Sequence, residues 1–236
     1  MSETLRFGMP LLDAAQAQKH ITVNEALLRV DALGAGRVES ADLTVPPVGA
    51  TDGEAYIVAT GATGAWLGQD GNVALFLNGG WEFAAPFSGL TIWIESEGTI
   101  ATFGAGSWIR GYAGGSAGGA ATLSRVLETD HLLASATVST TAAIIPDKAI
   151  VLGVTGRVIQ AISGASSWSL GVAGSPDRYG SGYGVALNSF AQGLTSQPQS
   201  YFGATPLEIT SADVAFTGGR ILLSVHILEL SGPSAI

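Results

Sequence analysis

Residues 54–93, EAYIVATGATGAWLGQDGNVALFLNGGWEFAAPFSGLTIW, decide the fold of the first half of the chain. Short apolar runs alternate there with glycine-containing turns, and each run has about the length of one β-strand. The dipeptides Asp70-Gly71 and Asn78-Gly79 are strong short-range signals for tight turns between strands. The stretch therefore predicts a small β-module whose strands are the runs 55–59, 73–77 and 90–94.

Three tryptophans, Trp66, Trp81 and Trp93, recur in this module at intervals of about one strand plus one turn. The stretch has no histidine and no cysteine, and its acidic residues show no pairing pattern. Such a stretch is chemically quiet, so we expect its tryptophans to fill the core of the module.

A short helix is predicted before the module, over residues 22–33. Thr22 and Glu25 have the spacing of a capping box, in which both side chains satisfy free backbone N–H groups at a helix start. Gly34 stands where a helix C-cap is expected. The apolar positions follow at helical spacing and are predicted to form the packed side of the helix: Val23, Ala26, Leu27, Val30 and Leu33.

The composition suggests association with other chains. Only 12% of the 236 residues are charged, against about 25% in ordinary soluble domains, and glycine is about twice as common as usual. A surface with so few charges is expected to be partly covered, so we predict a homo-oligomer, with a trimer expected first and a pentamer as the alternative. The net charge of −9 and the scattered basic residues argue against a nucleic-acid partner.

The sequence indicates no targeting or metal chemistry. The first residues lack the basic and apolar regions of a signal peptide, and no apolar run reaches the ~20 residues of a membrane span. Without cysteine there are no disulfides or thiolate metal sites. We therefore expect no cofactor, no metal and no membrane insertion.

Glycine and alanine dominate residues 111–122, GYAGGSAGGAAT, which predict a flexible linker between domains 1–110 and 123–236. Residues 123–133 are compatible with either a helix or a strand. The following residues have the period of two that is typical of strands, and they predict a C-terminal β-sandwich, jelly-roll-like. The expected strands are 135–140, 142–145, 149–155, 158–163, 167–172, 184–187, 207–210 and 220–230. The predicted fold class is thus mainly β, with a short N-terminal helical segment in a small α+β module.

Motifs in the first 110 residues carry a specific resemblance. They include PLL at 10–12, QKH at 18–20, NEAL at 24–27 and GATGAW at 61–66. Further matching positions are 31–33, 46–47, 54–58, 68–69, 79–81, Pro86 and Trp93. This pattern resembles an N-terminal domain of unknown function found in tail fibres and head spikes of alphaproteobacterial prophages and gene transfer agents.

The resemblance implies a place on a phage-like particle. In such proteins the N-terminal part attaches to the particle, at a capsid vertex or tail, and the distal part meets the host surface. The run 144–174 is similar, more loosely, to C-terminal domains of the same proteins. The chain is short and has one copy of each module, which favours a head spike over a tail fibre on the surface of the particle.

Recognition is expected in the predicted loop 175–202, because long loops on a rigid β-scaffold often carry binding residues. Aromatic faces, planar amides and charged groups suit the C–H faces and hydroxyls of sugars, and the loop is rich in them. Packing at an interface or core edge is the alternative role for its tyrosines. The candidate glycan-binding residues are Trp168, Asp177, Arg178, Tyr179, Tyr183, Asn188, Gln199 and Tyr201.

Three functions remain open. The first is a non-enzymatic spike that binds capsular polysaccharide and promotes adsorption to the host. The second is a spike-base or baseplate subunit without a ligand. The third is a glycan depolymerase, which would need two carboxylates at a defined separation. Four acidic residues are available for the third role, and no pattern singles out a catalytic pair: Asp147, Asp177, Glu208 and Asp213.

Overall fold

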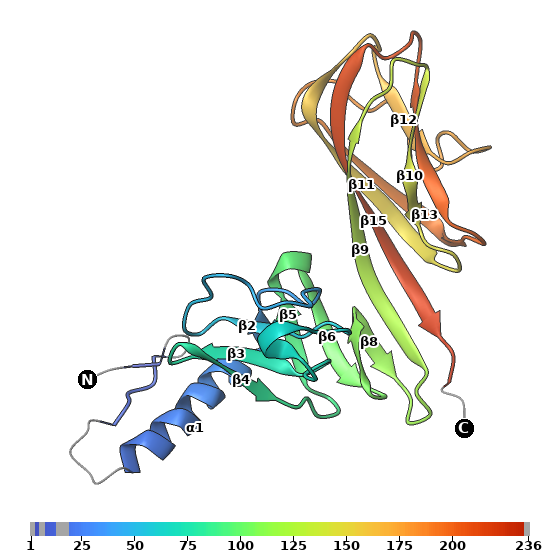
Figure 1. The fold of residues 1–236 in the computed structure, drawn as a ribbon. Coiled ribbons are helices and arrows are strands. Elements are labelled where there is room, and N and C mark those ends of the chain that lie inside the picture. Colours follow the sequence, from blue (N-terminus) through green and yellow to red (C-terminus); the bar gives the residue numbers. More distant parts are fainter. Residues whose placement is uncertain (1–2, 5–7, 13–18, 234–236) are drawn as a thin grey trace. The chain divides into compact units, whose positions relative to one another are not determined.

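A computed structural model of the chain describes residues 3–4, 8–12 and 19–233 (Figure 1). The chain divides into two compact units, Met1–Tyr112 and Ala113–Ile236. The predicted fold class is confirmed, because one short α-helix near the N-terminus is followed by mainly antiparallel sheets.

The N-terminal unit contains two small sheets. Its four-stranded sheet has the order β1 (Arg37–Val38), β5 (Thr91–Ile94), β6 (Thr99–Gly104) and β7 (Ser107–Arg110). Its three-stranded sheet has the order β2 (Ala55–Ile57), β3 (Val73–Leu77) and β4 (Gly80–Ala84). Two 3-10 turns, η1 (Gly64–Trp66) and η2 (Glu95–Glu97), connect strands. The three predicted runs are thus strands β2, β3 and β5, with shorter bounds for β2 and β5.

The turn between β3 and β4 follows the sequence prediction. Asn78 and Gly79 are its two central residues, and their φ angles are 52° and 76°. A two-residue hairpin turn of type I′ requires positive φ at both positions, which asparagine tolerates and glycine adopts freely. This turn fixes the antiparallel register in which Leu77 pairs with Gly80.

Strands β2 and β3 are buried on both faces. Ile57 and Leu75 belong to one buried cluster, and Tyr56 and Ala74, which alternate with them, belong to a second. The second cluster is aromatic, and the fully buried ring of Trp66 lies with its centroid 5.0 Å from that of Trp81. Trp66 therefore fills the core as expected.

Trp93 corrects that expectation for one of the three tryptophans. Its side chain is 39% exposed, and its Nε1 donates to Glu95 Oε2 at 3.0 Å. In β5, Ile92 and Ile94 alternate with Trp93 and take the two buried positions. The strand can direct only alternate side chains into the core, so Trp93 lies on the outer side.

Helix α1 (Lys19–Gly34) begins earlier than predicted. Thr22 lies inside the helix, so residues 22–25 do not form a capping box at its start. The packed side differs in part: Leu33 packs against the core as predicted and Leu28 joins it, whereas Val23 and Val30 are 41% and 56% exposed. Gln18, part of one resemblance motif, lies outside the described residues.

Polar contacts explain this orientation of α1. Thr4 Oγ1 donates to Asp31 Oδ1 at 2.8 Å, and Asp31 is buried. Arg29 forms an ion pair with Glu82 of β4 at 2.9 Å. These contacts hold the Leu28 and Leu33 side of the helix against the module, and they leave Val23 and Val30 exposed to solvent.

Residues 111–122 do not form the predicted flexible linker. Strand β8 (Tyr112–Gly115) and the start of β9 (Ala121–Leu132) lie in this segment and neighbour each other in one sheet. A tight turn joins them, with Ser116 N donating to Ala120 O at 2.8 Å. The glycine-rich residues form a hairpin here because their backbone groups hydrogen-bond to a neighbouring strand. The expected boundary region is therefore ordered β-structure.

The C-terminal unit is a two-layer sandwich, as predicted. One layer has the order β13 (Phe190–Ser200), β11 (Ile150–Ser163), β15 (Gly218–Ser231), β9 and β8. The other has the order β10 (Val138–Ile145), β14 (Thr205–Ser211) and β12 (Trp168–Gly171). From β9 to β15 the chain changes layer at every connection, a double-sheet pattern of the jelly-roll kind.

Several predicted boundaries in this unit are corrected. The segments 149–155 and 158–163 form the single strand β11, and 135–140 and 142–145 largely merge into β10. Residues 184–187 are not a strand. The ambiguous segment 123–133 is the strand β9. Bulges within β10 and β11 let these strands continue where the sequence pattern is interrupted.

One hydrophobic core lies between the two layers. In β15, Ile221, Leu223, Val225 and Ile227 are fully buried and alternate with less buried residues. The facing layer contributes Leu170 and residues of β14 to the same cluster. The strict alternation shows that the five-stranded sheet has one face in the core and one face directed outward.

Candidate functional site

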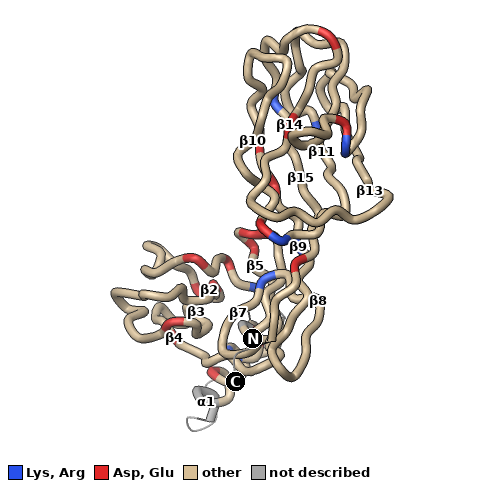
Figure 2. Tube along the Cα trace, turned by 90° about the vertical axis from the view of Figure 1, so that its right-hand side faces the viewer, with Lys and Arg blue, Asp and Glu red and all other residues tan. Residues whose placement is uncertain are grey.

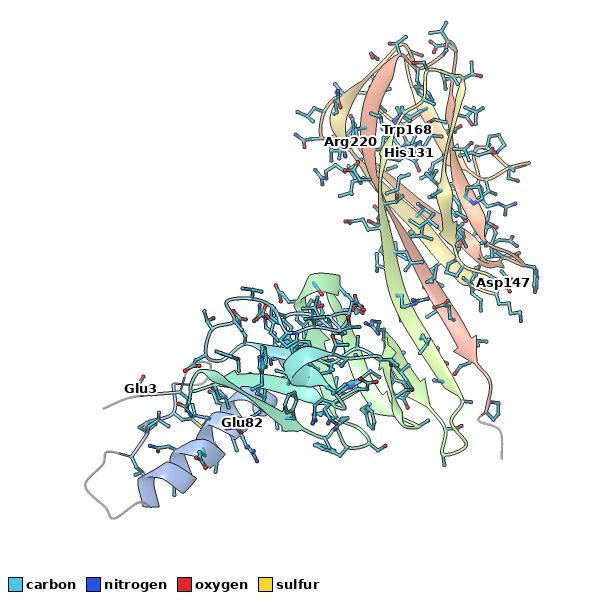
Figure 3. All side chains as sticks on the ribbon, in the orientation of Figure 1. Glu3, Glu82, His131, Asp147, Trp168 and Arg220 are labelled. Carbon is cyan, nitrogen blue, oxygen red and sulfur yellow. The ribbon has the colours of Figure 1, made fainter. Side chains whose placement is uncertain are left out.

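The structure buries the aromatic residues that were predicted to bind glycan. Trp168 and Tyr179 are each 1% exposed and belong to the hydrophobic core. Figure 3 labels Trp168 within the sandwich. Its Nε1 donates to Gly184 O at 2.9 Å. Burial prevents either ring from offering its face to a sugar, so these two residues support the surface from below.

Tyr183 and Tyr201 are partly buried and pack against this core. The Tyr183 ring lies 4.9 Å from that of Trp168, and its hydroxyl donates to Tyr179 O. The hydroxyls of Tyr179 and Tyr201 are 2.6 Å apart and hydrogen-bonded. The pKa of Tyr179 lies above its usual range, mainly because the hydroxyl is buried and also because of this hydrogen bond. Four predicted residues are thus brought together, as a scaffold.

The predicted loop 175–202 is shorter than expected, because its second part is strand β13. The remaining loop folds back over β13 at Gly193. A Cβ atom added to Gly193 would lie 2.1 Å from Tyr179 O. Glycine is therefore required at that position for the loop and the strand to approach each other.

The polar candidates meet at the surface of this scaffold. Arg178 Nη1 donates to Gln199 Oε1 at 3.1 Å, and its Nη2 donates to Ser175 Oγ at 3.0 Å. Asp177 is exposed in the same turn, where Gly180 N donates to its carbonyl oxygen. The guanidinium and the amide are therefore held in place while remaining accessible to solvent.

A neighbouring pair of turns extends this area. Gly203 N donates to Asp147 Oδ1 at 2.6 Å, and Lys148 N donates to Tyr201 O at 2.8 Å. Between these contacts Phe202 is 88% exposed. We define the Phe202 surface by these residues: Asp147, Lys148, Asp177, Arg178, Gln199, Tyr201 and Phe202. Asp147 is labelled in Figure 3, at the turn between β10 and β11.

Lys148 has a strained backbone, with φ of 62°. Non-glycine residues in this region cost about 1–3 kcal/mol and often occur where a surface is functional. Here the conformation is fixed by the two hydrogen bonds that join residues 147–149 to residues 201–203. The Phe202 surface is therefore a defined arrangement of side chains on paired turns.

Asn188 does not join this surface. It lies before the start of β13, whereas Gln199 lies near the end of that strand. Eleven residues of strand span about 30 Å. The backbone N–H of Asn188 donates to Val158 O of β11 at 2.9 Å, which places Asn188 at another end of the sandwich.

Sequence reasoning missed Phe202 and Lys148. Phe202 stood inside the predicted loop, but its exposure depends on the pairing of two turns that are far apart in the sequence. Asp147 was considered only as a candidate catalytic acid. A possible signal was the turn sequence Pro146-Asp147-Lys148 between two apolar strands.

A second feature lies on the outward face of the five-stranded sheet. It is a hollow of about 260 Å³. The small residues Thr155, Gly156 and Ser224 form part of its lining, together with Arg157, Phe190 and Gln192. None of these residues was a sequence candidate, because the hollow is created by the registers of β11, β13 and β15.

Within the described part of the chain, no group of three or more histidine, cysteine, aspartate or glutamate side chains is arranged to hold a metal ion. In that same part, no helix has both the length and the apolar character needed to cross a bilayer.

The N-terminal unit contains a segment that is similar to a known protein family. Residues 23–109 match the family model described as "Protein of unknown function (DUF2793)". No curated protein matches the chain. The matched segment lies within the region whose motifs carried the resemblance, and the family description assigns no activity to it.

One solved structure with detectable likeness is described as "Cyanophage Pam1 capsid asymmetric unit". The matched chain is 24% identical, and the alignment covers 45% of the present chain and 84% of that chain. The TM-score is 0.36, which is too low to support an inference about fold or function.

Proposed function

We propose that this chain is a non-enzymatic structural subunit on the surface of a phage-like particle. The N-terminal unit attaches it to other particle proteins, and the C-terminal sandwich contacts cell-surface polysaccharide. The motif resemblance of the first 110 residues, the low charge content and the mainly β architecture support this proposal. A head spike is the placement that we favour, in a homo-oligomer of three or five copies.

The Phe202 surface is the observation that carries the binding proposal. It combines an aromatic ring that is 88% exposed with a guanidinium and an amide that are already held together. An exposed aromatic ring suits the C–H face of a sugar, and the guanidinium, amide and carboxylate suit hydroxyls.

Binding of the purified full chain to capsular polysaccharide tests this proposal. We expect Phe202→Ala and Arg178→Ala each to weaken binding roughly tenfold, a loss of about 1.4 kcal/mol. Leu187→Ala is the matched control, because Leu187 is also an exposed apolar loop residue, at 56%, outside the Phe202 surface. Equal binding by all four proteins, or binding by none, would contradict the assignment.

A ligand-free structural role is the second candidate. The observation that favours it is the exposed side of α1, where Val23 and Val30 have no packing partner in the described core. Particles that lack the protein distinguish the two roles. Loss of attached proteins or of particle integrity supports the structural role, whereas intact particles that adsorb poorly to encapsulated cells support polysaccharide binding.

We propose no catalytic activity for the acidic residues. Asp147 accepts from Gly203 N, and Asp213 accepts from Ser166 N at 3.2 Å, so both serve as turn-stabilising groups. Incubation with purified capsule should release no reducing ends. If ends are released, Asp147→Asn and Asp177→Asn variants would show whether the Phe202 surface is responsible.

A further inference from the structure

The outward face of the five-stranded sheet mixes polar and large apolar side chains and is not covered within the described part of the C-terminal unit. On β15 the outward residues are Leu222, Ser224, His226 and Leu228, since they alternate with the fully buried Ile221, Leu223, Val225 and Ile227. The register then assigns their outward neighbours on the adjacent strands. A sheet face that remains in water normally alternates apolar-in with polar-out. This face departs from that pattern.

Large apolar side chains lie across the face. Phe190 and Leu194 on β13 are 63% and 74% exposed, and Val126 on β9 is 59% exposed. Val126 pairs with His226, and Phe190 lies in the same cross-strand row as Arg157 and Leu222. Between these rows lies the hollow lined by Thr155, Phe190 and Ser224. The face therefore offers both protruding apolar groups and a recess that can receive one.

Two opposite charges on this face lack an ionic partner. Among the residues that the structure describes, Arg157 on β11 and Glu128 on β9 form no ion pair. Glu128 receives only a long hydrogen bond, 3.3 Å from Ser224 Oγ. By contrast, the nearby Asp130 is paired with Arg220 at 2.6 Å. Figure 2 shows how few charged residues the C-terminal unit carries.

We infer that copies of the chain associate through this face around a rotational axis, with the β11 and β13 side of one copy against the β9 side of the next. Such packing brings Arg157 of one copy to Glu128 of the next, and it inserts an exposed apolar group into the hollow. Charge complementarity is thus built into a single surface, as self-association requires. The inference rests on the proposed homo-oligomeric subunit and specifies its interface.

The size of the face fits this role. Strands β11 and β15 have 14 residues each, and the neighbouring strands β9 and β13 have 12 and 11. At about 3.3 Å per residue and about 4.8 Å between strands, the four strands present about 800 Å². A stable interface of standard size buries about 800 Å² on each partner.

Light scattering on the full chain at micromolar concentration tests the inference. We expect an oligomer for the unmodified protein, and a mass decreased to that of one chain, 23.9 kDa, for Leu194→Glu and for Phe190→Glu. The matched control Leu187→Glu introduces the same charge on an exposed loop and should leave the oligomer intact. Circular dichroism and thermal melting would confirm that each variant remains folded.

A charge exchange gives a second, independent test. Arg157→Glu and Glu128→Arg should each weaken association at least tenfold, and the double variant R157E/E128R should recover most of it. If the unmodified chain is a monomer, both the homo-oligomer proposal and this inference fail. If the unmodified chain is an oligomer that none of these face variants affects, the interface lies elsewhere and only this inference is overturned.

Discussion

The two units use glycine for different physical purposes. Among the described glycines, eight would place an added Cβ within 3.0 Å of another atom, and all eight belong to the C-terminal unit. The N-terminal unit instead uses glycine where φ is positive, as at Gly79 in the hairpin turn, where a Cβ would meet nothing within 4 Å. Both units use positive-φ glycines, and the C-terminal unit also uses glycine where a strand and another segment approach closely.

The difference follows from strand length. Strands in the N-terminal unit have two to six residues, so a turn is needed every few residues. The main constraint on its glycine positions is therefore the backbone conformation of these turns. The C-terminal unit has strands of up to 14 residues, onto which loops fold back. In that unit, the space between a loop and the strand that it covers limits the size of the residue that fits. Substitutions should therefore act through different mechanisms in the two units.

The largest expected effect comes from truncating the fully buried tryptophan of either unit. Trp66→Ala and Trp168→Ala should each lower the free energy of unfolding by about 3–5 kcal/mol. We expect each substitution to expose mainly the amides of its own unit. Hydrogen exchange measured by mass spectrometry would report this, and equal loss of protection in both units after either change would show that they unfold as one.

A pair of glycine substitutions tests the comparison directly. Gly193→Ala should destabilise the C-terminal unit by about 3 kcal/mol, because the new methyl group would lie 2.1 Å from Tyr179 O. Gly79→Ala should cost about 1–2 kcal/mol, because alanine must adopt a positive φ in an open position. Urea denaturation measures both values. A larger loss of stability for Gly79→Ala than for Gly193→Ala would contradict the distinction between glycines needed for space and glycines needed for backbone conformation.

The indole N–H groups of Trp66 and Trp168 give a further comparison of the two units, with a smaller expected change in stability. Trp168 Nε1 donates to Gly184 O, whereas Trp66 Nε1 is buried without a hydrogen-bond partner among the described residues. Trp168→Phe leaves a carbonyl without its donor, while Trp66→Phe removes an unsatisfied donor. We expect Trp168→Phe to be more destabilising by about 1–2 kcal/mol in thermal unfolding. A larger loss for Trp66→Phe would contradict this.

The smallest effect concerns pH. Burial lowers the pKa of His131, against the opposing charge of Asp130, and its Nε2 is hydrogen-bonded to Ser139 Oγ at 2.8 Å. The unfolded chain then binds a proton more readily than the folded one, so stability should fall as pH decreases below about 6.5, the ordinary pKa of histidine. His131→Gln should decrease the difference between melting temperatures at pH 7.5 and pH 5.5.

Much of the fold was predictable because its signals are local. The turn at Asn78-Gly79, the short runs around it and the alternation in β15 all depend on neighbours in sequence. The start of α1 was predicted wrongly because a capping pattern at Thr22 also occurs inside a longer helix. The supposed linker was wrong because glycine-rich composition does not distinguish a hairpin from a mobile segment.

The candidate surface was predictable only in part. Arg178 and Gln199 do meet, as their shared segment suggested, but Tyr179 is buried in the core and Tyr183 and Tyr201 are partly buried against it. Whether Tyr179 or Phe202 faces water depends on which layer each neighbouring segment joins. That choice is made by contacts between residues far apart in the sequence, such as the pairing of residues 147–149 with residues 201–203.

The pairing of the first and last long strands has a consequence for how this protein can evolve. In the antiparallel β9–β15 pair, Ala121 lies opposite Ser231, so the two chain ends of the sandwich are neighbours. Domains with adjacent ends are readily inserted, permuted or exchanged between carriers. The sandwich can thus behave as a cassette that recombination transfers between chains.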